Sequence, residues 1–217
     1  MSYQWDGITK SSSVAGWVIE RRTALADRAR AYDWPGLFEL LGQDTNVSWI
    51  NAARLDGRSW YAPLHQAAHA GAPVEVARRL VELGAWRALR TADGERPLDI
   101  ALRLGHDHLR EALAPPRLIE VHDWELQMIQ ELFHGLIRSR AGRLVDREAL
   151  RLPELEVLLE TPGHATVFTI PGFYGGFHFT LHAGDGPTRL TTEISQRMGG
   201  SDGDRHEITR DEIKALG

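Results

Sequence analysis

The stretch APLHQAAHAGAPVEVARRLVELGA, residues 62–85, decides the fold predicted for the first half of this 217-residue chain. It returns in altered form as RPLDIALRLGHDHLREAL, residues 96–113. Pro63 and Pro97 stand at the same place in the two copies, 34 positions apart, a period typical of proteins built from stacked helix pairs. Since such a stack presents an extended surface, the repeat favours binding over catalysis.

Each copy carries the start and stop signals of two short helices. Pro63 suits the first position of a helix, where its missing N–H has no partner to lose, and Gly71 ends that helix. Apolar residues then recur at helical spacing over residues 74–83, and Gly84 follows as the next stop. The sequence therefore predicts an inner and an outer helix in each copy, with a turn before the next pair.

A weaker copy precedes these two. Residues 14–32 show a helical pattern, and a second helix is predicted to begin near Pro35, with Asp33 as its N-cap. Residues 1–13 are polar and are predicted to be irregular. Residues 42–61 are predicted to form a long finger-like connection to the second copy.

The motifs of the second copy resemble one ankyrin repeat, and residues of about 20–114 resemble a short array of two to three. Ala62 replaces the usual Thr and Pro73 marks a one-residue insertion, but neither departure changes the fold that is expected. The resemblance implies binding of another protein through turn tips and the inner helix face. It also implies that the ring of His65 hydrogen-bonds to backbone near the turn. The matching positions are Ala62-Pro63-Leu64-His65, Ala67-Ala68, Gly71 and Val81-Glu82-Leu83-Gly84-Ala85, with Asn51-Ala52 closing the repeat before.

After Pro116 the sequence pattern changes. Residues 118–141 and 146–160 have apolar residues at helical spacing, and from Ala165 the period becomes two. Residues 177–182 and 188–197 alternate as two strands of a hairpin, and a third strand is expected over residues 205–209.

The fold predicted is mainly α with a C-terminal α+β part. An ankyrin array over residues 1–116 is capped by a helix and a small antiparallel sheet over residues 117–217. Parts of this C-terminal region resemble the tail of uncharacterised bacterial ankyrin-containing proteins, which supports the pairing of domains and implies no mechanism. The matching segments are Pro171-Gly172-Phe173-Tyr174-Gly175-Gly176-Phe177, Gly199-Gly200-Ser201 and Arg205-His206-Glu207-Ile208-Thr209.

Composition excludes several classes of function. A net charge of −5 and a pI near 6.1 predict no nucleic acid and no anionic membrane as partner. No run of 18 apolar residues occurs, and the N-terminal sequence lacks the pattern of a secretory signal. The lack of cysteine excludes disulfides and thiolate chemistry, so a cytoplasmic location without a cofactor is expected. Abundant Ala, Gly, Leu and Arg beside rare Lys indicate a bacterial, GC-rich genome.

Candidate partner-binding residues lie in the predicted finger loops and on the inner helices. Aromatic residues and Arg anchor interfaces because they bury much area at little cost in rotamer freedom. The alternative for the aromatic residues is packing on a neighbouring repeat, and for the helix positions it is plain solvated surface. The set is Trp49, Trp60, Tyr61, Gln66, His69, Trp86, Arg87, Asp99 and Arg103.

The C-terminal region offers an alternative, a small-molecule or acid–base site of isomerase, cyclase or hydrolase type. The glycine-rich loop contributes Phe173 and Tyr174 as candidates for lining an apolar pocket, although both residues would equally pack against the helix around Phe133. The ordinary reading of the polar strand residues is the solvated side of an antiparallel sheet. The catalytic candidates on the predicted strands are His178, His182, His206, Glu193 and Glu207.

No metal site is predicted. His65 and His69 are four apart on a helix, but no third ligand is near them in sequence. The segment GGSDGD, residues 199–204, lacks the downstream Glu of a calcium loop and is interpreted as a turn.

The function expected from the sequence as a whole is an interaction module that binds an unidentified protein partner.

Overall fold

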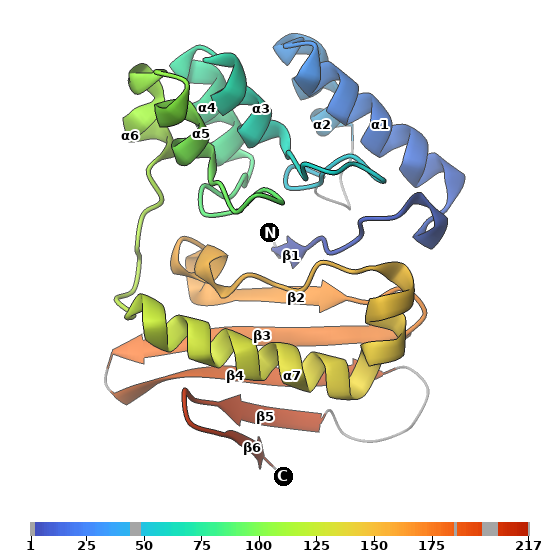
Figure 1. Ribbon diagram of the computed structural model, residues 1–217, viewed down its shortest axis with the longest axis vertical. Helices are drawn as coiled ribbons and strands as arrows, with labels where there is room; N and C mark the ends of the chain where they lie inside the picture. Colours follow the sequence, from blue (N-terminus) through green and yellow to red (C-terminus); the bar gives the residue numbers. More distant parts are fainter. Residues whose placement is uncertain (1–2, 44–48, 185, 197–203, 217) are drawn as a thin grey trace. The chain divides into compact units, whose positions relative to one another are not determined.

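The computed structural model describes residues 3–43, 49–184, 186–196 and 204–216. The chain is mixed α+β and divides into two compact units (Figure 1). The helical unit is Thr9–Pro115, and the sheet unit combines Met1–Ile8 with Pro116–Gly217. The prediction that residues 1–13 belong with the array and are irregular is wrong for the first of them, because Gln4 and Trp5 form a strand of the sheet unit.

The helical unit begins with the pair predicted as the weak copy. After a short 3₁₀ turn, η1 (Ser11–Ser13), it forms α1 (Gly16–Arg30) and α2 (Trp34–Gly42). The predicted N-cap is confirmed, since the Asp33 side chain accepts a hydrogen bond from the Gly36 N–H at 3.1 Å.

The second pair is α3 (Pro63–Ala70) and α4 (Val74–Glu82), as the sequence predicts. Pro63 occupies the first turn, and Gly71 ends α3 with a left-handed backbone, φ 60°. The Ala72 N–H bonds back to the carbonyl of Ala67 at 3.0 Å, which closes the helix end.

The third pair is shorter than predicted on its outer side. Its inner helix is α5 (Pro97–Arg103), and its outer half is split into η2 (Asp107–Leu109) and α6 (Arg110–Leu113). Alanines fill much of the core of this unit, because small side chains let paired helices approach closely. The fully buried ones include Ala67, Ala68, Ala77 and Ala101.

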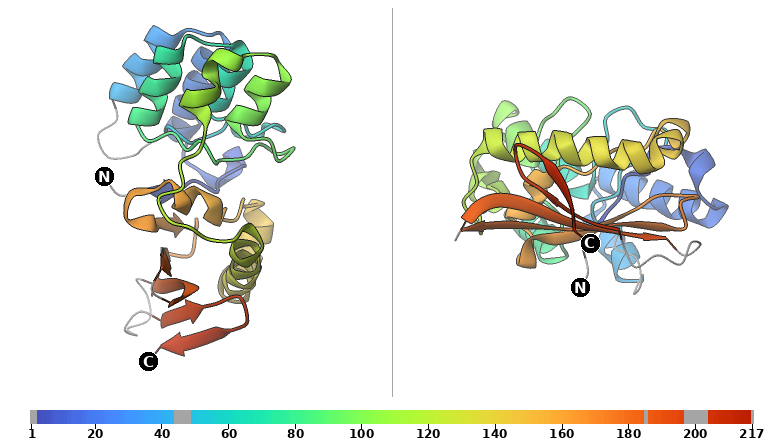
Figure 2. Two further views of the ribbon diagram at one scale, coloured as in Figure 1. Left: turned by 90° about the vertical axis from the view of Figure 1, so that its left-hand side faces the viewer. Right: turned by 90° about the horizontal axis from the view of Figure 1, so that it is seen from below.

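The sheet unit contains a six-stranded sheet in the order β1-β2-β3-β4-β5-β6 (Figures 1 and 2). The first pair of strands is parallel and all the others are antiparallel, so the predicted three-stranded antiparallel sheet is extended by two strands at one edge and by one strand at the other. The strands are β1 (Gln4–Trp5), β2 (Ala165–Thr169), β3 (Gly175–Gly184), β4 (Gly186–Gln196), β5 (Asp204–Ile208) and β6 (Ile213–Leu216).

One long helix, α7 (Asp123–Glu148), lies along one face of this sheet, as the right-hand view of Figure 2 shows. The two helices predicted over 118–141 and 146–160 are replaced by α7, which bends at Ala141 where φ is −135°, and by short 3₁₀ turns. The turns are η3 (Leu155–Leu159) and η4 (Pro162–His164). Phe133 of α7 packs on Phe179 of β3, with ring centroids 4.8 Å apart. This contact identifies the apolar face of the sheet.

The N-terminal segment is anchored inside the sheet unit. The Trp5 side chain is 1% exposed, its indole N–H donates to the Arg151 carbonyl at 2.9 Å, and the Arg151 guanidinium lies 5.0 Å from the ring centroid. Arg151 also donates its backbone N–H to Gly7 at 2.9 Å. Buried aromatic area and these hydrogen bonds explain why so short a strand is held in the sheet.

Candidate functional site

Two finger loops lead into α3 and α5, the first over residues 49–62 and the second over residues 83–96. Backbone hydrogen bonds connect the two loops. In the second loop the Thr91 N–H donates to the Glu95 carbonyl at 2.9 Å, which makes a tight hairpin. The Ala92 N–H donates to the Ser59 carbonyl of the first loop at 3.0 Å. Asn51 adds a link, since its amide bonds to the Gly84 carbonyl and the Trp86 N–H, each at 2.9 Å.

His65 and Asp99 occupy the same place in successive helices and make the same contact. Nδ1 of His65 accepts from the Ala62 N–H at 3.2 Å, and a carboxylate oxygen of Asp99 accepts from the Arg96 N–H at 2.8 Å. His65 is fully buried, and its Nε2 lies 2.9 Å from the Leu89 carbonyl, to which it donates once Nδ1 is the acceptor. The predicted backbone role of His65 is confirmed, whereas Asp99 is a capping residue.

A hollow of about 410 Å³, here called the array hollow, lies on the inner side of the helical unit. Four predicted binding residues line it, namely Trp60 and Tyr61 from the first finger loop and Gln66 and His69 from α3. These positions converge because the loop runs directly into α3, whose exposed side carries the other two. Also lining it are Ala26, Arg30, Tyr32, Arg54, Gly57, Ser59 and Asp93.

Two aromatic residues of the array hollow have a left-handed backbone. The φ angle is 55° at Trp60 and 59° at Tyr32. This region is unfavourable for large side chains, and such strain gathers at ligand-binding positions. Tyr61 lies between two histidines, with its ring centroid 5.7 Å from that of His65 and 6.1 Å from that of His69.

The charges of the array hollow are unequally neutralised. Arg54 forms an ion pair with Asp27, and the Tyr32 hydroxyl lies 3.5 Å from Nδ1 of His69. Arg30, at the exposed end of α1, has no carboxylate partner among the residues that the structure describes. Asp93 is the single carboxylate among the lining residues.

Other predicted binding residues do not line this hollow. The prediction of exposed contacts is wrong for Trp49 and Trp86, which are 9% and 3% exposed. Arg103 lies on α5 and pairs in a bidentate manner with Glu95, at 2.6 and 2.8 Å. This pair lowers the pKa of the Glu95 carboxyl and raises the pKa of Arg103. Arg87 follows Trp86 and is half-buried.

Sequence reasoning missed the contribution of the first helix pair. Arg30 and Tyr32 stand at the end of α1, just where α3 ends in the next pair. When the two helices are aligned at these ends, Ala26 of α1 is equivalent to Gln66 of α3, and both residues line the array hollow. The helical pattern of α1 was visible in the sequence, but the first copy lacks the motifs that would have aligned it with the second copy.

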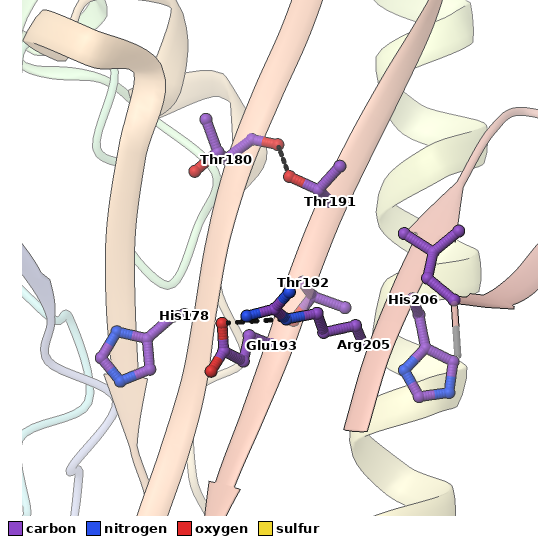
Figure 3. A pocket seen from close by; sticks show the side chains of 8 residues that line it. His178, Thr180, Thr191, Thr192, Glu193, Arg205 and His206 are labelled. Atoms are coloured by element: carbon purple, nitrogen blue, oxygen red, sulfur yellow. Dashed lines mark hydrogen bonds and ion pairs between the residues drawn. The ribbon is translucent and has the colours of Figure 1, made fainter. Parts of the chain in front are cut away.

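The sheet unit has a hollow of about 330 Å³ on the face away from α7, here called the sheet hollow (Figure 3). Register places His178, Glu193 and Arg205 side by side on β3, β4 and β5. The Arg205 Nε lies 3.4 Å from the Glu193 carboxylate, and Figure 3 shows this pair between His178 and His206. Thr180, Thr191 and Leu216 also line this hollow, and so do Thr192 and His206, whose strand positions face α7.

The predicted cluster of histidines is divided between the two faces of the sheet. His206 pairs with Thr192, which pairs with Phe179 on the α7 face, so His206 lies on that face and is 5% exposed. Its Nδ1 and the Thr192 hydroxyl are buried and have no hydrogen-bond partner within the described parts of the chain. The prediction that His206 shares one polar face with His178 and His182 is therefore wrong.

The remaining catalytic candidates are engaged with neighbours. Nε2 of His182 lies 2.9 Å from the Thr191 hydroxyl, and burial, together with the charge of Arg189, lowers the pKa of His182. Glu207 lies 3.4 Å from Arg189. On the α7 face, Nε2 of the buried His206 lies 3.6 Å from an Asp204 carboxylate oxygen, a histidine–carboxylate contact of the kind that acid–base catalysis uses.

The glycine-rich loop does not form the predicted apolar pocket. Phe173 is buried and stacks on Phe177 with ring centroids 5.8 Å apart, whereas Tyr174 is 69% exposed. Within the described ranges, no group of three or more His, Asp or Glu side chains is arranged to hold a metal ion. The predicted turn at 199–204 lies outside the described residues except for Asp204, which pairs with Arg140 at 2.5 Å.

Comparison of this chain with models of known protein families gave no match, and no curated protein matched it either. In the part of the chain that the structure describes, no helix combines the length and apolarity needed to cross a membrane.

Proposed function

We propose that this chain is a protein-interaction module of the ankyrin-repeat type, and that its helical unit binds a partner protein at the array hollow. The observation that carries the proposal is the convergence of Trp60, Tyr61, Gln66 and His69 on one hollow. Rings of this kind supply large contact area with few rotatable bonds, which suits an interface anchor.

The ankyrin assignment is supported by three features of the helical unit. Each of the last two pairs begins with a proline at the first helical turn, and a finger loop precedes it. The loops are joined edge to edge by the bond from Ala92 to Ser59. Asn51 and His65 each bond to backbone of the following repeat, which holds successive repeats in register. A composition without cysteine favours a cytoplasmic setting for this module.

Backbone strain at the array hollow supports the same function. A left-handed Trp60 costs stability that a glycine at that position would not cost. Trp60 is half-exposed in this conformation and lines the same hollow as His69. In the sheet unit, by contrast, the register places His206 on the face opposite His178 and His182.

The test uses the full chain as bait in a lysate of its source organism, with cross-linking and mass spectrometry. A partner captured by the wild type should be lost with Trp60→Ala and with His69→Ala. Trp17→Ala is the matched control, since Trp17 is 62% exposed on α1 and does not line the hollow. Capture that survives both hollow variants, or that is lost equally with Trp17→Ala, would contradict the proposal.

A further inference from the structure

The ionic character of the array hollow indicates the chemistry of its partner. The lining residues that can carry a charge near neutral pH are Arg30, Arg54, His69 and Asp93. Arg54 is held by Asp27, so its charge is already compensated inside the protein. Arg30 is exposed and has no carboxylate partner among the described residues, so one guanidinium remains available to a ligand.

Three aromatic residues, Tyr32, Trp60 and Tyr61, line the same hollow as this guanidinium. Tyr32 follows Arg30 by two positions and stacks on Trp34, with ring centroids 6.0 Å apart and an interplanar angle of 26°. Trp60 and Tyr61 stand on the facing finger loop. A guanidinium binds a carboxylate through two parallel hydrogen bonds, and aromatic rings that line the same hollow offer packing area to an apolar side chain next to that carboxylate.

The distribution of charge along the chain agrees with an acidic partner. Residues 9–115 contain 14 basic and 13 acidic residues, a net charge of +1, whereas the rest of the chain contains 11 basic and 17 acidic residues, a net charge of −6. The helical unit is therefore the part of this acidic protein that an acidic segment approaches with least repulsion.

We infer that the array hollow binds a protein segment in which an Asp or Glu lies within one or two residues of an aromatic or large apolar residue. The carboxylate pairs with Arg30, and the apolar side chain packs among Tyr32, Trp60 and Tyr61. This inference rests on the proposed function, and it adds the chemical class of the partner segment.

The experiment selects binders from a random 12-residue peptide library displayed on phage, with the immobilised full-length protein as target. Enriched peptides are synthesised and their affinities measured by fluorescence anisotropy at low and high NaCl. Enrichment of Asp or Glu beside an aromatic or Leu residue is expected, together with weaker binding at high salt.

Variants then assign the acidic residue to Arg30. Arg30→Glu should weaken these peptides by about tenfold, and replacing the peptide's acid with Lys should restore binding to that variant. Arg78→Glu is the matched control, because Arg78 is exposed on the outer helix α4 and does not line the hollow. Asp93→Asn should instead tighten binding, since it removes the carboxylate that repels the ligand.

The possible outcomes separate the two claims. Peptides that are lost with Trp60→Ala but carry no acidic preference, or that are indifferent to Arg30→Glu, overturn this inference and leave the proposed function standing. A library that yields no enrichment, or binders that are indifferent to Trp60→Ala as well, overturns both.

Discussion

In both the helical unit and the sheet unit, the sequence predicts that a group of polar and aromatic residues shares one surface. The structure brings the predicted residues together in the helical unit but separates them in the sheet unit. In the helical unit Trp60, Tyr61 and His69 do converge, because a loop leads straight into the helix that completes the site. In the sheet unit His178 and His206 end on opposite faces. Grouping within a repeat depends on local geometry, whereas grouping on a sheet depends on the register between distant strands.

The largest expected effect tests whether Trp5 belongs to the sheet unit. Trp5→Ala removes a side chain that is 1% exposed and should lower the free energy of unfolding by about 3–5 kcal/mol. Native-state hydrogen exchange, read separately on peptides of the two units, measures where the loss falls. The loss of protection is expected in peptides from β2 and β3. The control variant Trp17→Ala, which changes an exposed residue of the helical unit, should alter protection in those peptides little. A loss confined to helical-unit peptides would show that the N-terminal segment supports the array instead.

A smaller effect is expected from His65→Ala, which separates the two equivalent capping positions. It leaves the Ala62 N–H and the Leu89 carbonyl without partners in a fully buried place, at a cost of about 1–3 kcal/mol. Asp99→Ala should cost less, because Asp99 is exposed and water replaces its single capping bond. Urea denaturation of both variants gives the comparison, and equal losses would show that burial at His65 contributes nothing.

The residues that begin and end the helices show how much of the fold the sequence could predict. Pro63, Gly71 and Asp33 act within a few residues of themselves, so their helix boundaries followed from local chemistry. The β3–β4 hairpin was predicted for the same reason, since its strands are adjacent in sequence. β1 was missed, because Gln4 and Trp5 pair with residues 167 and 168, far along the chain, and two residues carry no periodicity.

The candidate site was predictable to a similar extent. Trp60, Tyr61, Gln66 and His69 were selected because they stand in a predicted finger loop and on a predicted inner helix, and all four line the array hollow. Trp49 and Trp86 were misplaced, since sequence alone does not distinguish a ring that anchors a partner from one that fills the core.

The left-handed backbone at Trp60 allows the effect of this residue on stability to be separated from its effect on partner binding. A glycine adopts the left-handed region at no steric cost, so Trp60→Gly should be more stable than Trp60→Ala by about 1 kcal/mol. Both variants remove the indole ring and should lose partner binding to the same extent. Thermal unfolding and the peptide-binding assay provide the two readouts. If the Ala variant were the more stable, the left-handed backbone would not be a cost of keeping the ring in place.

The smallest expected effect concerns pH and belongs to the sheet unit. His134 of α7 donates its Nε2–H to the Pro153 carbonyl at 2.7 Å, and burial lowers the pKa of His134 below its ordinary value of 6.5. The unfolded chain therefore binds more protons between these two pKa values. The stability that the neutral ring contributes is present above pH 6.5 and is lost as the pH falls through the lower folded-state pKa.

His134→Gln keeps a donor for the Pro153 carbonyl but does not titrate. It should flatten the fall in stability as the pH is lowered from about 6.5, which urea denaturation at several pH values measures. The matched control, His178→Gln, replaces an exposed histidine of the same unit and should leave the fall as it is. Some slope should remain in both variants, because burial and the charge of Arg189 also lower the pKa of His182. An unchanged slope in His134→Gln would show that protonation at this position does not limit the stability of the sheet unit.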